Sequence, residues 1–150
     1  MELKSVLEIL KFALSKEKAS LQFYTDVAAR IKDPVTESVF EAIASEEQKH
    51  ISALELELMK IGYTIYPETE QNNGGVEWIE RLEMDEEDEN MDFRDAVMIA
   101  IQKEKAAIQL YTQVLSSITD PEHRKIFMEL AHEEIRHLTQ FEREYQALNE

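Results

Sequence analysis

The sequence predicts an all-α protein, a four-helix bundle built from two similar helical hairpins. The 150 residues contain only three glycines and three prolines, too few for the frequent turns of a many-stranded β-fold. Apolar residues recur every three or four positions over long stretches, which is the spacing of one helix face. Residues 9–59 also align without a gap with residues 96–146, and 19 of the 51 positions are identical. That similarity indicates a duplicated helical hairpin.

The first hairpin is expected to span about residues 2–61. Asp33 supplies an N-cap at its turn, and Pro34 takes the first position of the second helix. Gly62 is expected to end that helix. The apolar stripe of the first helix comprises Leu3, Val6, Leu7, Leu10, Leu14, Leu21, Tyr24, Val27 and Ile31. The stripe of the second helix comprises Val39, Phe40, Ile43, Ile51, Leu54 and Leu58.

The second hairpin, about residues 92–149, repeats this pattern, with Asp120-Pro121 at its turn. Its first stripe comprises Phe93, Val97, Ile101, Ile108, Tyr111, Leu115 and Ile118, and its second comprises Phe127, Leu130, Leu138, Phe141 and Tyr145.

A connection of about residues 62–91 joins the hairpins, far longer than the roughly two to eight residues that link adjacent bundle helices. It can run the length of the bundle, so we expect the second and third helices to be parallel, as in ferritin-like bundles with one long crossover. A short covering helix is expected around residues 76–82, followed by an acidic, solvated run at 85–92. We treat residues 1–150 as a single domain.

Composition excludes several classes of function. Thirty-two acidic residues against sixteen basic ones give a net charge of −16, which repels phosphate backbones and anionic membranes and attracts cations. The absence of cysteine excludes disulfides, thiol catalysis and iron–sulfur ligation. The longest apolar run, residues 96–101, is too short to span a membrane, and no signal-peptide core follows the first residues. We therefore expect a cytoplasmic protein that binds neither nucleic acid nor membrane.

Charged residues interrupt the apolar stripes near the midpoints of all four expected helices. Each hairpin supplies one Glu from its first helix and a Glu-x-x-His pair from its second. Burying four carboxylates together is costly unless cations compensate them, and no Lys or Arg lies on the inward stripes nearby. Two divalent cations would balance the four carboxylates, and two neutral imidazoles would complete the ligands. The predicted di-metal site consists of Glu17, Glu47, His50, Glu104, Glu134 and His137.

The alternative is a metal-free network in which protonated glutamates bond to histidine and tyrosine. Tyr24 and Tyr111 each lie seven residues after a midpoint glutamate, two turns along the helix. They can hydrogen-bond the ligand carboxylates, supply an electron, or serve only as core aromatics.

Other residues near the motif are interpreted as surface. Glu129 and His132 have the Glu-x-x-His spacing by chance but point away from the apolar stripe, and His123 lies in a first helical turn. Glu46 and Glu133 are expected to flank the site in solvent, from where either can turn toward a metal.

The two motifs Ala44-Ser45-Glu46-Glu47-Gln48-Lys49-His50 and Ala131-His132-Glu133-Glu134-Ile135-Arg136-His137 resemble those of the rubrerythrin (erythrin) branch of the ferritin-like superfamily. The resemblance covers both hairpins. It implies a di-iron site held by the six residues, with Glu47 and Glu134 bridging the metals. Two features depart from the family pattern: the cysteines of a rubredoxin domain are absent, and Ile101 and Ala107 replace an additional carboxylate near Glu104.

Members of that family commonly form dimers and reduce hydrogen peroxide, while relatives oxidise ferrous iron. We therefore expect a di-iron carboxylate oxidoreductase that reduces peroxide, with dioxygen as another possible oxidant and an external reductant protein as electron donor. Two iron ions are the expected cofactor, with manganese or a mixed pair as the alternative. Ferroxidase action in iron handling is the second hypothesis, and a non-enzymatic metal-binding or scaffold bundle is the third. A homodimer or higher homo-oligomer is expected.

Overall fold

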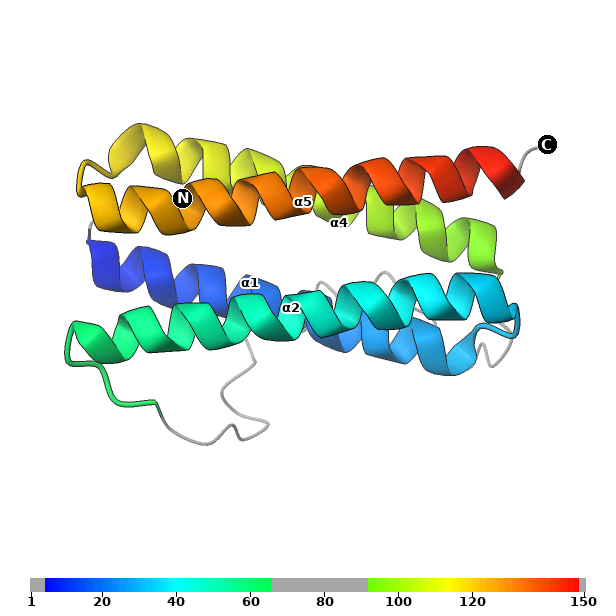
Figure 1. Ribbon diagram of the computed structural model, residues 1–150, viewed down its shortest axis with the longest axis horizontal. Helices are drawn as coiled ribbons and strands as arrows, with labels where there is room; N and C mark the ends of the chain where they lie inside the picture. The colour runs from blue at the N-terminus through cyan, green and yellow to red at the C-terminus, as the bar shows by residue number, and fades with distance from the viewer. Residues whose placement is uncertain (1–4, 66–91, 149–150) are drawn as a thin grey trace.

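Two antiparallel helical hairpins pack face to face in the computed structural model, which describes residues 5–65 and 92–148. Helix α1 (Val6–Arg30) packs against α2 (Pro34–Lys60), and α4 (Phe93–Ser117) packs against α5 (Pro121–Leu148) (Figure 1). Across the described residues every regular element is a helix. The predicted all-α bundle of two hairpins is therefore confirmed. The expected covering helix and most of the acidic run fall outside the described residues.

The hairpins are arranged so that α2 and α4 run in the same direction (Figure 1). Helix α1 is consequently antiparallel to α4, because each is antiparallel to its own hairpin partner. Contacts between α1 and α4 agree: Tyr24 meets Glu104, and Glu17 meets Tyr111. The expectation of parallel second and third helices is confirmed. This arrangement brings the midpoints of all four helices to one level.

Helix ends follow the capping signals of the sequence. Ser5 Oγ accepts a hydrogen bond from the backbone N of Glu8 at 3.1 Å, and Asp33 Oδ2 accepts one from the backbone N of Thr36 at 2.9 Å. Gly62 has a φ of 91°, and Tyr63 N donates back to Leu58 O at 3.0 Å. A positive φ with this backward bond is the usual glycine-terminated helix end, so α2 ends where the sequence predicts.

The apolar core forms two clusters on either side of the polar midpoint layer. One is centred on Tyr24, Phe40 and Phe141, and the other on Tyr111 and Phe127. Aromatic rings contact each other in both clusters, with centroid distances of 5.2–5.9 Å. These two packed ends hold the four helix midpoints together and keep water from the layer between them.

One expected core residue proves to be exposed. Leu7 is 38% exposed, whereas Ile9, Leu10 and Ala13 are buried. A straight helix rotates slowly away from a fixed pattern of threes and fours, so the buried face near the start of α1 differs from that at its middle. The stripe prediction for Leu7 is wrong for this reason.

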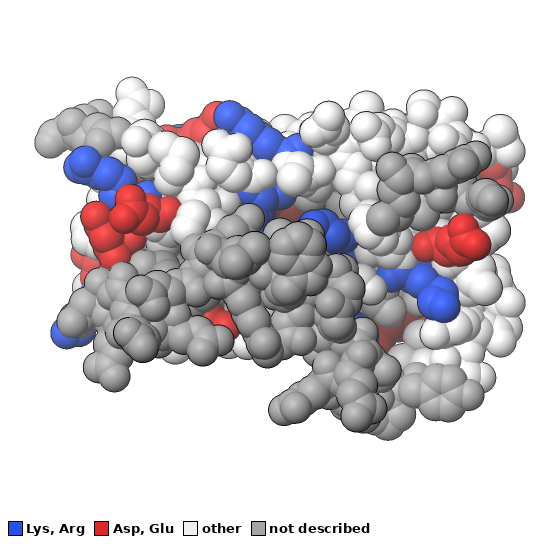
Figure 2. Space-filling model, turned by 180° about the vertical axis from the view of Figure 1, so that it is seen from behind, with Lys and Arg blue, Asp and Glu red and all other residues white. Residues whose placement is uncertain are grey.

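On the outside, the face seen in Figure 2 mixes basic and acidic side chains with uncharged areas, over the residues that are described. None of the described helices is sufficiently long and apolar to cross a membrane.

Candidate metal centre

All six residues of the predicted site are buried in the layer between the two apolar clusters. Helix spacing accounts for this, since each side chain follows the inward stripe of its helix. The least exposed are Glu47 and His137, and the most exposed is His50, at 9%. Because these side chains are so little exposed, the carboxylates depend on neighbouring protein groups, and not on water, for hydrogen bonds.

The six side chains form two overlapping groups that could each hold a metal ion. Glu47 and Glu134 belong to both groups. The first group adds Glu17 and His50, and the second adds Glu104 and His137. Each group thus combines residues of both hairpins, so neither hairpin contains a complete site.

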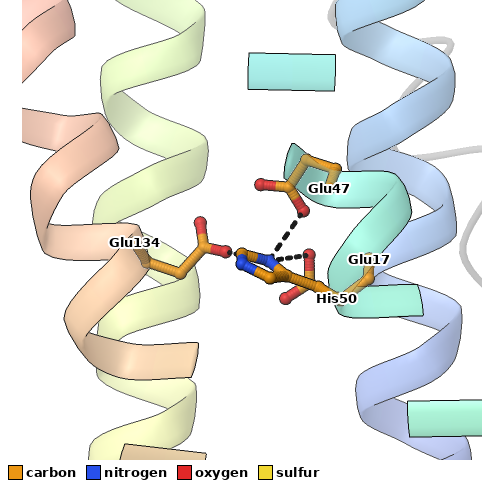
Figure 3. Close-up of side chains that lie close together, drawn as sticks. All are labelled: Glu17, Glu47, His50 and Glu134. Carbon is orange, nitrogen blue, oxygen red and sulfur yellow. Dashed lines mark ion pairs between the residues drawn. The ribbon is translucent and has the colours of Figure 1, made fainter. Parts of the chain in front are cut away.

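The two shared carboxylates each direct one oxygen to each histidine. Glu134 Oε1 lies 3.3 Å from His50 Nδ1, while its Oε2 lies 3.7 Å from His137 Nδ1. Glu47 Oε2 lies 3.7 Å from His50 Nδ1, while its Oε1 lies 3.4 Å from His137 Nδ1. Figure 3 shows Glu134 reaching from α5 toward the His50 ring, opposite Glu47 and Glu17. Both shared carboxylates therefore lie between the two histidines.

The two outer carboxylates are held by tyrosines from the opposite hairpin. The Tyr24 hydroxyl donates to Glu104 Oε1 at 2.5 Å, and the Tyr111 hydroxyl donates to Glu17 Oε1 at 2.5 Å. Of the sequence-based alternatives for these tyrosines, the hydrogen bond to a site carboxylate is the one observed. Each tyrosine bonds the glutamate of the other hairpin, not the one seven residues earlier on its own helix.

Several inward atoms of the layer have no hydrogen-bond partner within the described part of the chain. They are Glu47 Oε1 and Oε2, Glu104 Oε2, Glu134 Oε1, and Nδ1 of His50 and His137. Buried polar atoms in folded proteins are paired in the great majority of cases. Six unpaired atoms that converge on one layer indicate that something besides protein satisfies them.

Protonation equilibria reflect the crowding of charge. Burial and repulsion by a neighbouring carboxylate raise the pKa of Glu47 to about 7, and burial raises the pKa of Glu104 well above its usual range. Burial opposes charge on His50, but the carboxylates that face it, Glu134 first, outweigh that effect and raise its pKa to about 12. The same competition raises the pKa of His137. Without metal, protons on these groups take the place of cations.

A third group of possible ligands flanks the layer at the α2–α5 contact, formed by Glu46, Glu133 and His137. Glu46 Oε2 lies 2.6 Å from His137 Nε2, the ring nitrogen that faces away from the layer. Arg136 contacts the same oxygen at 2.5 Å and also binds Glu133 Oε2. Arg136 already bonds both carboxylates, so we interpret the group as an ion-pair network around His137. Glu46 was expected to flank the site in solvent, from where it could turn toward a metal, and its bond to a site histidine was not predicted.

Among the remaining candidates, Glu129 and His132 are exposed, as predicted. His123 lies within 3.0 Å of Asp120 at the start of α5, so it belongs to the helix end. One cation near the layer was missed. Lys103 lies 4.9 Å from the centre of the Phe23 ring, and burial lowers its pKa to about 7. The sequence indicated that Lys103 lies near the layer, because it directly precedes Glu104.

Comparisons with known proteins agree on the fold. The chain is similar to a two-domain protein from Anabaena variabilis that contains DJ-1/ThiJ/PfpI-like and ferritin-like domains, with 19% identity and a TM-score of 0.79. That match covers 94% of this chain and 39% of the other, so this chain spans well under half of the larger protein. A hypothetical protein from Pyrococcus furiosus matches with 20% identity and a TM-score of 0.71, over 96% of this chain and 90% of the other. These identities support the ferritin-like fold alone.

A search of curated proteins gives no significant match. The family model for rubrerythrin, in contrast, matches residues 8–145, nearly the whole chain and all six residues of the buried layer. The fold, the duplicated Glu-x-x-His motif and the two overlapping ligand groups are consistent with that match and fit a di-metal site. The chain therefore belongs to the rubrerythrin family.

Proposed function

We propose that this protein is a di-iron carboxylate oxidoreductase that reduces hydrogen peroxide to water with electrons from an external donor. The observation that carries the proposal is the set of unpaired inward atoms: oxygens of three glutamates and Nδ1 of both histidines converge on one dry layer. Membership of the rubrerythrin family supports iron as the metal.

The residues present fit a pair of metal ions. The histidine nitrogens lie 3.3–3.7 Å from the shared carboxylate oxygens, too long for good hydrogen bonds. When two ligand atoms each lie about 2.1 Å from the same ion, they are about 3.0–3.4 Å apart if the angle between their bonds to the ion is between a right angle and the tetrahedral angle. The observed spacings are close to that range. The four positive charges of two divalent cations would balance the four negative charges of the glutamates in the layer.

Within the proposed site, Glu47 and Glu134 would bridge the metals, because each offers one oxygen to either side. His50 and His137 would each hold one metal through Nδ1. Glu17 and Glu104 would be terminal ligands, each steadied by a tyrosine hydroxyl. When bound there, a ferrous pair would supply one electron from each ion, which gives the two electrons that cleavage of the O–O bond requires.

The protein itself would shape the site and exclude water from it. The apolar clusters at both ends close the layer along the bundle axis. His50 is the most exposed of the six site residues, so a small oxidant would approach from its side. The 150 residues contain no cysteine, and we propose that the reductant is a separate protein.

Ferroxidase action is a second candidate, favoured by the net charge of −16, which attracts ferrous ions as substrate. The two activities differ in the oxidant and in the fate of the iron. A peroxidase keeps its two irons and consumes one peroxide per pair, whereas a ferroxidase oxidises iron added in excess with dioxygen.

The test is stopped-flow mixing of protein loaded anaerobically with two ferrous ions against either hydrogen peroxide or dioxygen. We expect faster oxidation by peroxide, at one peroxide per two irons, and repeated turnover once a reductant is added. Faster oxidation by dioxygen with uptake of further iron supports the ferroxidase instead. Slow oxidation by both would leave a passive metal-binding bundle. Elemental analysis of protein purified without added metal tests the identity of the metal, because manganese would redirect the proposed chemistry.

A further inference from the structure

The two site histidines are equivalent in sequence but differ at their outer nitrogens. Both rings direct Nδ1 into the layer. The Nε2 of His137 lies 2.6 Å from Glu46 Oε2. The Nε2 of His50 has no carboxylate partner among residues 5–65 and 92–148, although duplication places Glu133 where Glu46 stands for His137. Two histidines with the same motif are therefore held differently.

Arg136 explains the difference. It stands where the first hairpin has Lys49. Its guanidinium bonds Glu133 one turn earlier on α5 and reaches across to Glu46 on α2. Glu133 is thereby turned toward Arg136 and not toward His50, while Glu46 is fixed beside His137. An arginine can hold two carboxylates at once through its fork of N–H groups, which the single ammonium of a lysine does less well.

A carboxylate on the outer nitrogen changes the ligand quality of a histidine. When Nε2–H donates to a carboxylate, the ring is locked with the Nδ1 lone pair toward the metal, and that nitrogen becomes more basic. Loss of such a partner typically weakens metal binding by about 10–100-fold. The ring of His50 lacks this partner and is also the more exposed of the two, at 9% against 0% for His137.

Building on the proposed di-metal site, we propose that Glu46, held by Arg136, is a positioning residue that makes the two metal positions unequal. The position at Glu104 and His137 binds metal more tightly. The position at Glu17 and His50 binds more weakly and exchanges its ion more readily. The two positions share their bridging carboxylates, so the difference lies in the histidines and their surroundings.

The test is titration of the metal-free protein with Co²⁺, followed by visible absorption and calorimetry. Wild-type protein should bind two ions in two resolved steps. In E46Q the tighter step should weaken about 10–100-fold, and E46D should restore part of it. The matched variant E129Q should leave both steps unchanged, because Glu129 is an exposed glutamate of α5 that lies outside the network of Glu46, Glu133 and Arg136.

Single-site backgrounds separate positioning from general electrostatics. H50A should retain the tighter position and H137A the weaker one, each binding one ion. E46Q should then weaken binding in the H50A protein and have no effect in the H137A protein. Circular dichroism of every metal-free variant checks that the helices persist.

Each outcome has a distinct meaning. If wild-type protein binds no Co²⁺, the proposed di-metal function fails. If it binds two ions with equal affinity, or if E46Q binds them as wild type does, the di-metal site stands and the positioning role of Glu46 is overturned. Equal weakening by E46Q in both single-site backgrounds also overturns it, because Glu46 would then act only as a nearby charge.

Discussion

The two hairpins place the same residues at the same level of the bundle, yet they treat them differently. In the dry layer the symmetry is kept: Tyr24 bonds Glu104 just as Tyr111 bonds Glu17. At the α2–α5 surface it is lost, because His137 has a carboxylate on its outer nitrogen and His50 has none among the residues that the structure describes. Duplication thus preserves the contacts on which a buried charge depends and relaxes those near solvent, where water can replace a lost partner.

We expect the largest effect from removing the two carboxylates that belong to both ligand groups, Glu47 and Glu134. In E47A/E134A both proposed metal positions would lose the carboxylates they share, so we expect metal content to fall from the proposed two ions per chain to nearly none. Helical circular dichroism should persist, since the apolar clusters above and below are untouched. Metal analysis after loading and gel filtration measures the effect.

The control for that variant is E41A/E129A, which removes one exposed glutamate from α2 and one from α5. It should bind metal as wild type does. Undiminished metal content in E47A/E134A would contradict the assignment of the ligands.

A second prediction concerns how the stability of the metal-free protein depends on pH through the two site histidines, one from each hairpin. The pKa of His50 is raised to about 12 and that of Glu47 to about 7. A group whose pKa is raised on folding stabilises the fold below its unfolded pKa, and this stabilisation is lost as the pH rises toward the folded value. The protonation of Glu134, whose pKa is lowered on balance, changes little above pH 5. The lowered pKa of Lys103, about 7, acts in the opposite direction above pH 7, but it is one group against the two imidazoles. The melting temperature should therefore fall from pH 5 to pH 9 in the presence of a chelator.

Bound metal should reverse this trend, because metal ions compete with protons for the same atoms and bind better as the pH rises. In H50L/H137L the decline without metal should be much shallower. A melting temperature of the metal-free wild type that stays constant or increases over this range would show that the imidazoles do not hold the extra protons.

The smallest expected effect tests whether the two halves of the buried layer are equivalent. Y24F and Y111F each remove one hydrogen bond to a buried carboxylate, a loss of about 1.5–3 kcal/mol in the free energy of unfolding. Each kcal/mol lowers the melting temperature by about 2–4 °C in a protein of this size. If the layer is symmetric, the two metal-loaded variants should melt at similar temperatures, below wild type. Y63F, on a half-buried tyrosine, is the control, and a large difference between Y24F and Y111F would contradict the symmetry.

Much of the site could be predicted because it depends on direction along a helix. Glu17 and Glu104 interrupt apolar stripes, and a side chain that follows a stripe points where the stripe points. The Glu-x-x-His pairs lie one turn apart on the same face. Their burial confirms this direction, whereas Leu7 was misplaced because the buried face drifts along a long helix.

The positions of Tyr24 and Glu46 were harder to predict. The sequence placed Tyr24 two turns from Glu17, but its hydroxyl bonds Glu104, which is 80 residues away. Glu46 meets His137 across 91 residues. Distances between helices, and not spacing along one helix, decide which partner is reached.

The sequence by itself determined the two hairpins, their caps and the inward direction of the buried glutamates and histidines. These follow from local rules, because the repeat of a helix fixes which side chains share a face. Only the tertiary structure decided which carboxylate oxygen faces which histidine, which tyrosine holds which glutamate, and that Arg136 favours His137 over His50. Such contacts depend on how closely and in which register the hairpins meet, and that is set by the packing of whole helix faces.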